Sequence, residues 1–399
     1  MKISNVKVTP VACHDQPILN SWGIHEEMFT RVIVEVETDA GIAGIGETHG
    51  GKKDKIESLV PDLLGKDPFN IEKLRQQFQD SLFEFSPVEI ALWDIMGKAT
   101  DRRVCDLLGG AVREEVPFSA YLFYKFPDEN GVGVILPEED TRSPETLVRE
   151  AEEFVDKFGF KTLKLKGGVL SPELEFKTLK LLHEKFPDYK LRIDPNSVWT
   201  VETTLEFTDK LLSNNIDLEY LEDPVNGNDD MAEVRKKQPI PLSTNTVVQG
   251  FEDIKEAYDK GSVDVVLGDH HLTIGGIMGY KEMGVVCDSL GWELSMHSNN
   301  HLGISMAAMV HAGACTPHLV YDADTHYPWT LPEQDIIKGG KLKFHDGKMK
   351  IPEGKGLGVE LDQDKLQEAN ERYRKGGWSD RDEMKKEMAE KWPFGYPRF

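Results

Sequence analysis

Six polar residues recur along the middle of the chain at nearly constant spacing, and each one ends a short, mainly apolar segment. They are Lys166, Asp194, Glu222, Asn245, Asp269 and His297, separated by 28, 28, 23, 24 and 28 residues. Each interval is long enough for one strand and one helix. Parallel strands connected by helices place all their carboxyl ends on one rim of a barrel, so we expect these side chains to meet there.

The first of these residues belongs to the segment Thr162–Lys166, which alternates as a strand does. Lys164 and Lys166 therefore share one face, and Leu163 and Leu165 share the other. Taken alone, two neighbouring lysines are also typical of an exposed edge strand, where they deter pairing with another chain. The polar residues at the later strand ends favour a shared site instead.

The pattern predicts an α/β protein with two kinds of architecture. Residues 1–115 read as an antiparallel meander followed by helices, which indicates an N-terminal α+β capping domain. Between residues 116 and 325, strands alternate with helices, which indicates a (β/α)8 barrel. The eight strands are expected at Val116–Leu122, Thr162–Lys166, Leu191–Asp194, Leu218–Glu222, Pro241–Asn245, Val263–Asp269, Trp292–His297 and His318–Asp322. Residues 326–399 are expected to complete the barrel edge and return to the cap.

Local signals predict the elements of the cap and of the tail. The cap strands are expected at Ile3–Ala12, Thr30–Thr38 and Ile42–Glu47, with a loop at Leu19–Met28, and the cap helices at Lys53–Leu64, Ile71–Ser81 and Val88–Ala99. Ser86 is expected to cap the third helix, with Pro87 in its first position. In the tail we expect a strand at Leu342–His345 and a charged helix around Lys365–Arg374.

Composition excludes several classes of partner. A formal net charge of −23 argues against nucleic acid, whose binding depends on Lys and Arg at phosphates. The four cysteines are scattered, so neither a disulfide framework nor a zinc ribbon is indicated. The N-terminus lacks the apolar segment of a signal peptide, and no apolar run has membrane-spanning length. We expect a cytoplasmic protein, a homo-oligomer, with neither membrane nor nucleic acid as a partner.

Asp194, Glu222 and Asn245 end three consecutive predicted strands and predict a metal site. Hard oxygen ligands of this kind suit Mg²⁺, with Mn²⁺ as a second candidate. The alternative is that each residue caps the helix that follows it. Two carboxylates neutralise a divalent cation, and a neutral third ligand leaves the site more favourable to an anionic substrate.

Lys166 and His297 are candidate bases on opposite sides of the barrel mouth. A divalent cation and the cationic Lys164 nearby favour the neutral amine of Lys166, which can accept a proton. Asp269, one strand before His297, can orient its imidazole and stabilise its charge. Two such bases around a metal-bound carboxylate can remove the α-proton, and the metal stabilises the resulting enediolate. Lys164 would also contact a substrate carboxylate.

Several motifs together resemble a known family. They are Lys164-Leu-Lys166-Gly-Gly-Val, Asp194-Pro-Asn196, Glu222-Asp223-Pro224, Thr244-Asn245, Asp269 and His297-Ser-Asn-Asn-His301. Nearly the whole chain, including Asp324-Thr325-His326 and the region of Arg381, is similar to the enolase superfamily and, within it, to the glucarate dehydratase subgroup. The resemblance implies a carbon–oxygen lyase of carbohydrate catabolism that removes water from an aldarate to give a keto-deoxy acid, with Mg²⁺ held by the three ligands above.

The resemblance also implies a set of substrate contacts. They are Asn20, His25, Tyr121, Asn196, His326 and Arg381, together with Lys164 and His297. From the sequence alone, His25 could equally be a surface loop residue, Tyr121 a core residue and Arg381 an ion-pair partner. The relatives carry a longer segment between the second and third cap helices, whereas here only Asp80–Ser86 joins them. The acid sugar therefore stays open among glucarate, galactarate, idarate and tartrate, and so does the choice between dehydration and epimerisation.

Two other kinds of protein are weighed against this hypothesis. A metal-dependent hydrolase on the same barrel needs a His-x-His motif on the first strand, and Val116–Leu122 contains no histidine. A non-catalytic accessory protein of the same fold should have lost a base or a ligand, and both bases and all three ligands are present.

Overall fold

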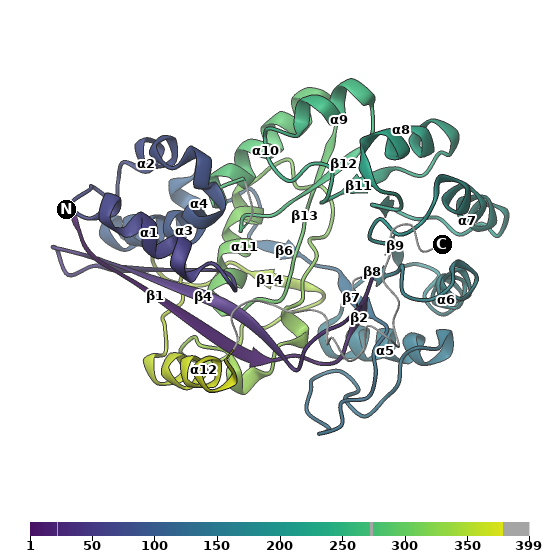
Figure 1. Cartoon of the computed structure of the whole chain (residues 1–399), viewed down its shortest axis with the longest axis horizontal. Coiled ribbons are helices and arrows are strands. Elements are labelled where there is room, and N and C mark those ends of the chain that lie inside the picture. Colours follow the sequence, from purple (N-terminus) through teal and green to yellow (C-terminus); the bar gives the residue numbers. More distant parts are fainter. Residues whose placement is uncertain (22, 272–273, 378–398) are drawn as a thin grey trace.

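The computed structural model describes residues 1–21, 23–271, 274–377 and 399. At the N-terminus, strands β1 (Ile3–His14), β4 (Met28–Thr38) and β5 (Ala43–His49) form an antiparallel sheet in that order. Helices α1 (Lys53–Leu63) and α3 (Leu82–Thr100) lie against its strands, and α2 (Ile71–Gln77) packs on α3 (Figure 1). Helix α3 packs very close to β5, because a Cβ at Gly46 would lie 1.9 Å from the Pro87 carbonyl oxygen.

The predicted start of the third cap helix is wrong. Helix α3 begins at Leu82, so Pro87 lies inside it and Ser86 is not its cap. Proline cannot donate the hydrogen bond that the Phe83 carbonyl would receive in a helix. The Ser86 hydroxyl donates to that carbonyl instead, at 2.9 Å, and the helix passes through the proline. The connection from α2 is thus the short turn η1 (Gln79–Ser81) rather than a loop at Asp80–Ser86.

Seven parallel strands form the second sheet. In spatial order they are β13 (Glu293–Met296), β12 (Val265–Gly268), β11 (Leu242–Thr244), β10 (Tyr220–Glu222), β9 (Lys190–Asp194), β8 (Thr162–Lys166) and β7 (Ala120–Phe123). The eighth place is filled by residues 319–323, which are held by single bridges from Leu294 to Leu319 and from Ala323 to Phe118. The sequence therefore predicted where the eighth strand lies. It did not predict that this segment is held by single bridges in place of a regular ladder of hydrogen bonds. The fold is a modified (β/α)8 barrel with a capping domain.

The first predicted barrel strand is also corrected. Val116–Leu122 is not one strand, because β6 (Glu115–Pro117) pairs antiparallel with β14 (Lys348–Lys350), and β7 begins only at Ala120. The expected tail strand at Leu342–His345 is also wrong. The strand of the tail is β14, which pairs with β6. Both errors concern pairing between segments more than two hundred residues apart.

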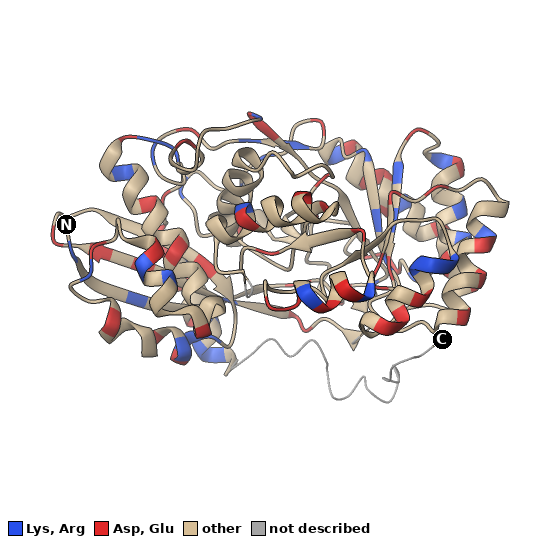
Figure 2. Ribbon diagram, turned by 90° about the horizontal axis from the view of Figure 1, so that it is seen from above, with Lys and Arg blue, Asp and Glu red and all other residues tan. Residues whose placement is uncertain are grey.

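Helices surround the barrel sheet on its outside (Figure 1). They are α5 (Pro144–Phe158), α6 (Pro172–Lys185), α7 (Val201–Ser213), α8 (Gly227–Lys237), α9 (Ile254–Lys260), α10 (Ile277–Leu290) and α11 (Gly303–Cys315), after the short α4 (Val104–Leu107). The hydroxyls of Ser143, Ser171 and Thr200 cap three of them. Acidic and basic residues are interspersed along the outer helices (Figure 2). Helix α11 is buried along its whole length and contacts β5 of the cap.

The cap and the tail both reach the barrel. Where a loop was expected at Leu19–Met28, a small hairpin of β2 (Leu19–Asn20) and β3 (Gly23–Ile24) forms, and Ile18 bridges to Lys125. The tail continues through η2 (Tyr327–Trp329), η3 (Pro332–Gln334) and β14 to α12 (Gln363–Gly376), the expected charged helix. Asn370 and Arg372 of α12 donate to carbonyls of β1. The domain boundaries at residues 115 and 325 stay a prediction.

None of the helices in the described ranges combines the length and the apolar character that a membrane span requires.

Candidate active site

The six polar residues of the sequence series lie at one rim of the barrel. Lys166, Asp194 and Glu222 are the last residues of β8, β9 and β10. Asn245, Asp269 and His297 directly follow β11, β12 and β13. Because all seven strands are parallel, these positions belong to the carboxyl end of the barrel. Strand β8 lies between β7 and β9, so it is not an edge strand.

An ion pair joins the first two of these residues. The Lys166 ammonium lies 2.5 Å from Oδ2 of Asp194, and the Tyr121 hydroxyl donates to the same oxygen at 3.1 Å. The backbone N–H of Asn196 donates to Oδ1 of Asp194 at 2.9 Å. Burial acts to raise the pKa of Asp194, but Lys166 and Lys164 outweigh it and lower the pKa. Asp194 is therefore held as a carboxylate.

Lys164 is a buried cation behind this pair. Its ammonium is ion-paired with Asp324 and lies 2.5 Å from Oε2 of Glu222, and the side chain is 0% exposed. Burial acts to lower the pKa of Lys164, but Asp324 and Glu222 outweigh it and hold the pKa well above its usual value. Its positive charge is therefore held between two carboxylates. In this position Lys164 can attract a substrate carboxylate through its charge, and a direct hydrogen bond to the substrate would require the ammonium to move.

Glu222 is the strongest indication of a cation site. It is fully buried, and neither of its carboxylate oxygens accepts a hydrogen bond from any residue in the described ranges, although Lys164 is close to one of them. Burial raises its pKa well above the usual value. A buried carboxylate without donors is costly, and a divalent cation would satisfy it. The donor set of Asp194, Glu222 and Asn245 therefore fits Mg²⁺ chemically.

The third proposed ligand is positioned by Asp223. Its two carboxylate oxygens accept from the Asn245 backbone N–H at 2.9 Å and from the hydroxyls of Thr244 and Thr246 at 2.6 and 2.7 Å. Burial raises the pKa of Asp223 to about 6. The helix-capping alternative for the ligand set is wrong. The helices that follow Asp194, Glu222 and Asn245 are preceded by Thr200, Asn226 and Asp253.

On the other side of the rim, Asp269 binds His297. Its Oδ2 lies 3.0 Å from Nδ1 of His297, and its Oδ1 accepts from the His271 backbone N–H at 2.8 Å. Burial acts to raise the pKa of Asp269, but hydrogen bonds from His271 and His297 outweigh it and hold the pKa well below its usual value. A carboxylate at Nδ1 leaves the lone pair of His297 on Nε2, which can accept a proton.

Most residues expected to contact substrate are buried next to this rim. The rings of Tyr121 and His326 lie 4.7 Å apart, and Tyr121 is not simply a core residue, since its hydroxyl faces Asp194. His25 is 2% exposed, which excludes a surface loop residue, and its Nε2 lies 3.2 Å from the Asn20 amide nitrogen. The Ser21 hydroxyl donates to the side chain of Asn196 at 2.8 Å. Arg381 lies outside the described residues.

Sequence reasoning missed two carboxylates that organise the site. Asp324 pairs with Lys164 and follows the predicted eighth strand, so the rule that found the other strand ends could have found it. Asp15 joins the cap to the barrel, because its Oδ2 lies 2.9 Å from Nδ1 of His25 and accepts from the Asn300 amide at 2.7 Å. No local signal in the sequence pointed to Asp15 as a link of this kind.

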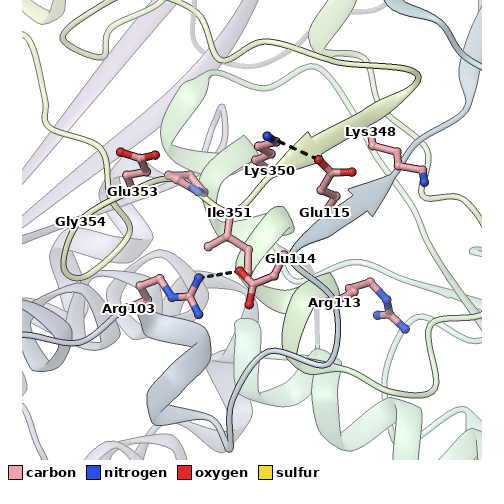
Figure 3. Close-up of a pocket in the computed structure, with 10 residues that line it drawn as sticks. Arg103, Arg113, Glu114, Glu115, Lys348, Lys350, Ile351, Glu353 and Gly354 are labelled. Atoms are coloured by element: carbon pink, nitrogen blue, oxygen red, sulfur yellow. Dashed lines mark hydrogen bonds and ion pairs between the residues drawn. The ribbon is translucent and has the colours of Figure 1, made fainter.

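A second polar surface lies at the other end of the barrel, where β6 meets β14 (Figure 3). This groove is lined by Arg103, Arg113, Glu114, Glu115, Lys348, Lys350, Ile351, Pro352, Glu353 and Gly354. Arg103 pairs with Glu114 at 2.9 Å, and Lys350 lies 3.9 Å from Glu115. None of the residues of the rim lines it.

Comparisons with known proteins show the family of the chain. Residues 3–109 match the model of the mandelate racemase / muconate lactonizing enzyme N-terminal domain, and residues 146–365 match that of the enolase C-terminal domain-like family. The chain belongs to the enolase superfamily.

Three relatives indicate the chemistry found within that family. The chain is 39% identical to a probable glucarate dehydratase of Streptomyces coelicolor, over 92% of this chain and 90% of that protein. An enolase of Pseudomonas fluorescens, solved with bound magnesium, potassium and tartrate, is 38% identical and has a TM-score of 0.93, with 100% of this chain and 99% of that one covered. A D-galactarolactone cycloisomerase of Agrobacterium fabrum is 29% identical, over 91% and 98% of the two chains.

Proposed function

We propose that the protein is a Mg²⁺-dependent acid-sugar dehydratase, similar in action to glucarate dehydratase. One observation carries the proposal. Lys166 ends β8 and His297 follows β13, and the carboxylates at the ends of β9 and β10 lie between these two strands in the order of the sheet. A substrate carbon held near those carboxylates would have one base on each face.

Asp194, Glu222 and Asn245 would hold the cation, with Mn²⁺ as a substitute. When bound, it would neutralise the charge that develops on the substrate carboxylate as the α-proton leaves. Lys166 Nζ, once it is released from its ion pair with Asp194 and neutral, or His297 Nε2 would accept that proton, according to the configuration of the α-carbon. The base that does not take the proton can donate one to the departing hydroxide, so that water leaves and a keto-deoxy acid forms.

The proposed substrate is a dicarboxylic acid sugar. Lys164 adds a fixed positive charge behind the carboxylates, which favours an anion at the metal. The second carboxylate would meet donors further out, for which His25, His326 and Arg381 are the candidates. The solved relative with tartrate and magnesium, and the relative named as a probable glucarate dehydratase, support a dicarboxylate.

Turnover of a substrate panel tests the proposal. Glucarate, idarate, galactarate, tartrate and gluconate are incubated with enzyme and Mg²⁺, and keto-acid formation is measured. We expect turnover of dicarboxylates, with glucarate as the first candidate. Preference for galactarate or tartrate changes only the named substrate, whereas preference for gluconate defeats the dicarboxylate argument.

A second candidate function is epimerisation of the same class of substrate. It is favoured because the chain is also similar to proteins named as an N-succinyl-L-Arg/Lys racemase and as a hydrophobic dipeptide epimerase, at 26% and 27% identity. Two opposed bases can remove a proton from one face and return it to the other without loss of water. Product analysis decides, since an epimerase yields the epimer and no keto acid. We further expect a homo-oligomer in the cytoplasm.

A further inference from the structure

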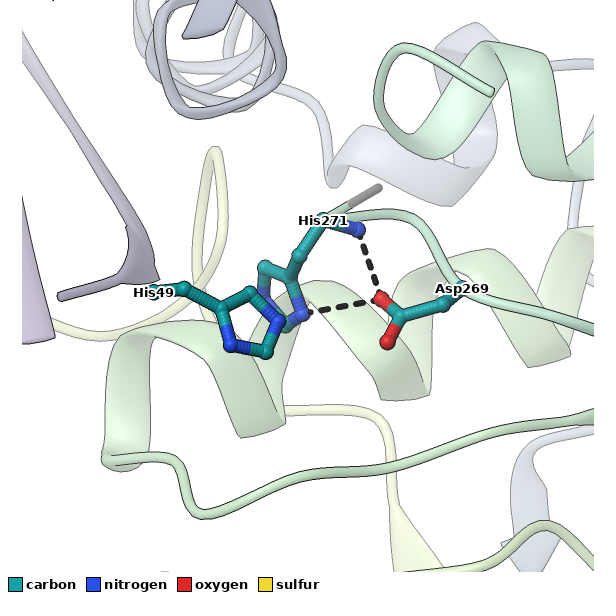
Figure 4. Close-up of side chains that lie close together, drawn as sticks. All are labelled: His49, Asp269 and His271. Carbon is teal, nitrogen blue, oxygen red and sulfur yellow. Dashed lines mark hydrogen bonds and ion pairs between the residues drawn. The ribbon is translucent and has the colours of Figure 1, made fainter. Parts of the chain in front are cut away.

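The carboxylate that binds His297 is itself bound by a second histidine. Asp269 binds His297 through Oδ2, and its other oxygen is bound by His271, through the backbone N–H at 2.8 Å and through Nδ1 at 3.2 Å (Figure 4). His271 Nε2 lies 2.5 Å from the Ser305 hydroxyl. Ser305 in turn lies 3.3 Å from Nδ1 of His301.

The contacts continue to the segment that lies beside β13. His301 Nε2 lies 3.2 Å from the hydroxyl of Thr325, which follows Asp324, the partner of Lys164. Every residue from Asp269 to Thr325 in this series is buried, with at most 4% of its surface exposed. The amino end of α11, which carries Ser305, is itself fixed by Glu47, which accepts from the backbone N–H groups of Leu302 and Ser305.

The chemistry of the groups gives this series one direction. The carboxylate of Asp269 only accepts hydrogen bonds, so His271 must carry its proton on Nδ1. Burial lowers the pKa of His271 and of His301, so both rings are neutral and each has one donor and one acceptor. His271 Nε2 therefore accepts from Ser305, and the Ser305 oxygen accepts from His301 Nδ1. His301 Nε2 is then left to accept from the Thr325 hydroxyl, in place of the weaker contact at 3.7 Å between that hydroxyl and Sδ of Met306.

We propose that His271 is a positioning residue for His297, and that it is the last link of a one-way series of hydrogen bonds running from Thr325 through His301 and Ser305 to Asp269. The proposal rests on the proposed function in taking His297 as a base. The series fixes the rotation of the Asp269 carboxylate, and that carboxylate fixes the tautomer and direction of His297. The series also ends next to Asp324, the partner of Lys164.

A metal ion is the competing explanation for the same cluster. His49, Asp269 and His271 have ligand atoms within 4.8 Å of one another (Figure 4). Both ring nitrogens of His271 are, however, already engaged, one by Asp269 and one by Ser305. The carboxylate of Asp269 is likewise shared between two histidines. Hydrogen bonds therefore account for the cluster without an ion.

The first experiment measures proton positions in the resting protein. Nitrogen-15 NMR of the histidine rings, with signals assigned by comparing single variants, reports which nitrogen carries the proton. We expect His271 and His301 to be neutral and protonated on Nδ1, and Nδ1 of His297 to carry a proton that is shared with Asp269. Protonation of His271 on Nε2 would overturn the direction of the series, and a broad shift of His49 and His271 signals on adding Zn²⁺ at equal concentration would favour the metal explanation.

The second experiment measures α-proton exchange in D₂O at each configuration of a slow aldarate. His271→Phe should lower exchange through His297 by about 10- to 100-fold, the worth of a hydrogen bond to a charged group, and leave exchange through Lys166 nearly unchanged. His271→Asn should recover part of the loss, because its amide can donate where Nδ1 did. Ser305→Ala should cause a smaller loss of the same kind.

His311→Asn is the matched control. His311 is also a fully buried histidine. It lies in α11 and is bonded to the Leu357 carbonyl, outside this series. A variant that only loosens the fold should affect both faces equally, as this control would. Equal losses on both faces for His271→Phe and Ser305→Ala would overturn the positioning role. If the wild-type protein exchanges neither face, the proposed function fails, and the NMR result still decides the series.

Discussion

The two sides of the barrel rim hold their candidate bases in opposite ways. On the lysine side (Lys164, Lys166, Asp194 and Glu222), charges are paired directly and almost completely buried. On the histidine side (Asp269, His271 and His297), one carboxylate is shared between two imidazoles. The lysine side is therefore built on charge balance, and the histidine side on hydrogen-bond direction.

The difference indicates what each side needs from a ligand. The carboxylates of the lysine side are balanced by lysines, and Glu222 accepts no hydrogen bond within the described residues, so a cation can replace the lysine charge or add to it. On the histidine side, each hydrogen-bond donor of the series already has an acceptor. The only group that this side has to receive from the substrate is the α-proton, at Nε2 of His297. We therefore expect metal and charge changes to act on the first side, and changes in tautomer to act on the second.

Metal removal should have the largest effect. Exhaustive EDTA treatment should lower turnover by about 1,000-fold or more, because charge stabilisation in the transition state is lost, and Mg²⁺ should restore it. Glu222→Gln should weaken Mg²⁺ binding, as measured by calorimetry, while the proton positions of the histidine side stay unchanged. Full activity of the metal-free protein would contradict the assignment of a cation to the lysine side.

Asp269→Asn should come next. An amide at this position can no longer accept strongly from both histidines, and His297 loses its preferred tautomer. We expect kcat to fall by about 100- to 10,000-fold with Mg²⁺ affinity unchanged. The effect should resemble a milder form of His297→Asn, in which the base itself is lost. A change chiefly in Mg²⁺ affinity would place Asp269 on the metal side instead.

Lys164→Met should separate the two sides by stability. It leaves Glu222 and Asp324 close together in the interior without their cation. The free energy of unfolding, measured in urea without metal, should fall by about 3–5 kcal/mol. His297→Asn should cost only about 1 kcal/mol, the net worth of one hydrogen bond. Equal losses for the two variants would contradict the charge-balance account.

A smaller, pH-dependent effect is expected at Glu89, which accepts from the backbone N–H groups of Ile277 and Met278 at the start of α10, behind the histidine side. Burial raises its pKa from 4.5 to about 7. The folded protein therefore keeps a proton that the unfolded chain releases, so this contribution to stability is complete below pH 4.5 and is lost as pH rises through about 7.

Comparison with Glu89→Gln isolates that contribution. The difference in unfolding free energy between the wild type and this variant should change by on the order of 1–3 kcal/mol across the window. The wild type should lose stability relative to the variant as the pH rises. A difference that is independent of pH would mean that Glu89 does not titrate there.

The sequence predicted the rim well because its rule is local. A polar residue at a strand end needs only its own strand and the parallel order to be placed, and Asp194, Glu222 and Asp269 follow that rule. Residues whose role depends on a distant partner were missed. Asp15 meets Asn300 only when the cap packs on the barrel, and His271 meets Ser305 only when the amino end of α11 reaches the segment after β12.

The errors in the fold have a similar cause. Ser86-Pro87 is a good local signal for a helix start, but the Ser86 hydroxyl satisfies the carbonyl that proline leaves open, and tertiary contacts extend the helix. Val116 was assigned to the barrel by its pattern, whereas its pairing partner is Met349. A local pattern cannot name a partner so far along the chain.

The most direct test of the two-base account is stereochemical. A slow aldarate and its α-epimer are incubated in D₂O with Mg²⁺ and with the wild type, Lys166→Ala or His297→Asn, and deuterium at the α-carbon is measured. The account predicts that the wild type exchanges both epimers, that Lys166→Ala loses exchange at one configuration, and that His297→Asn loses it at the other. Loss of both by either variant, or intact exchange and dehydration in Lys166→Ala, would contradict it.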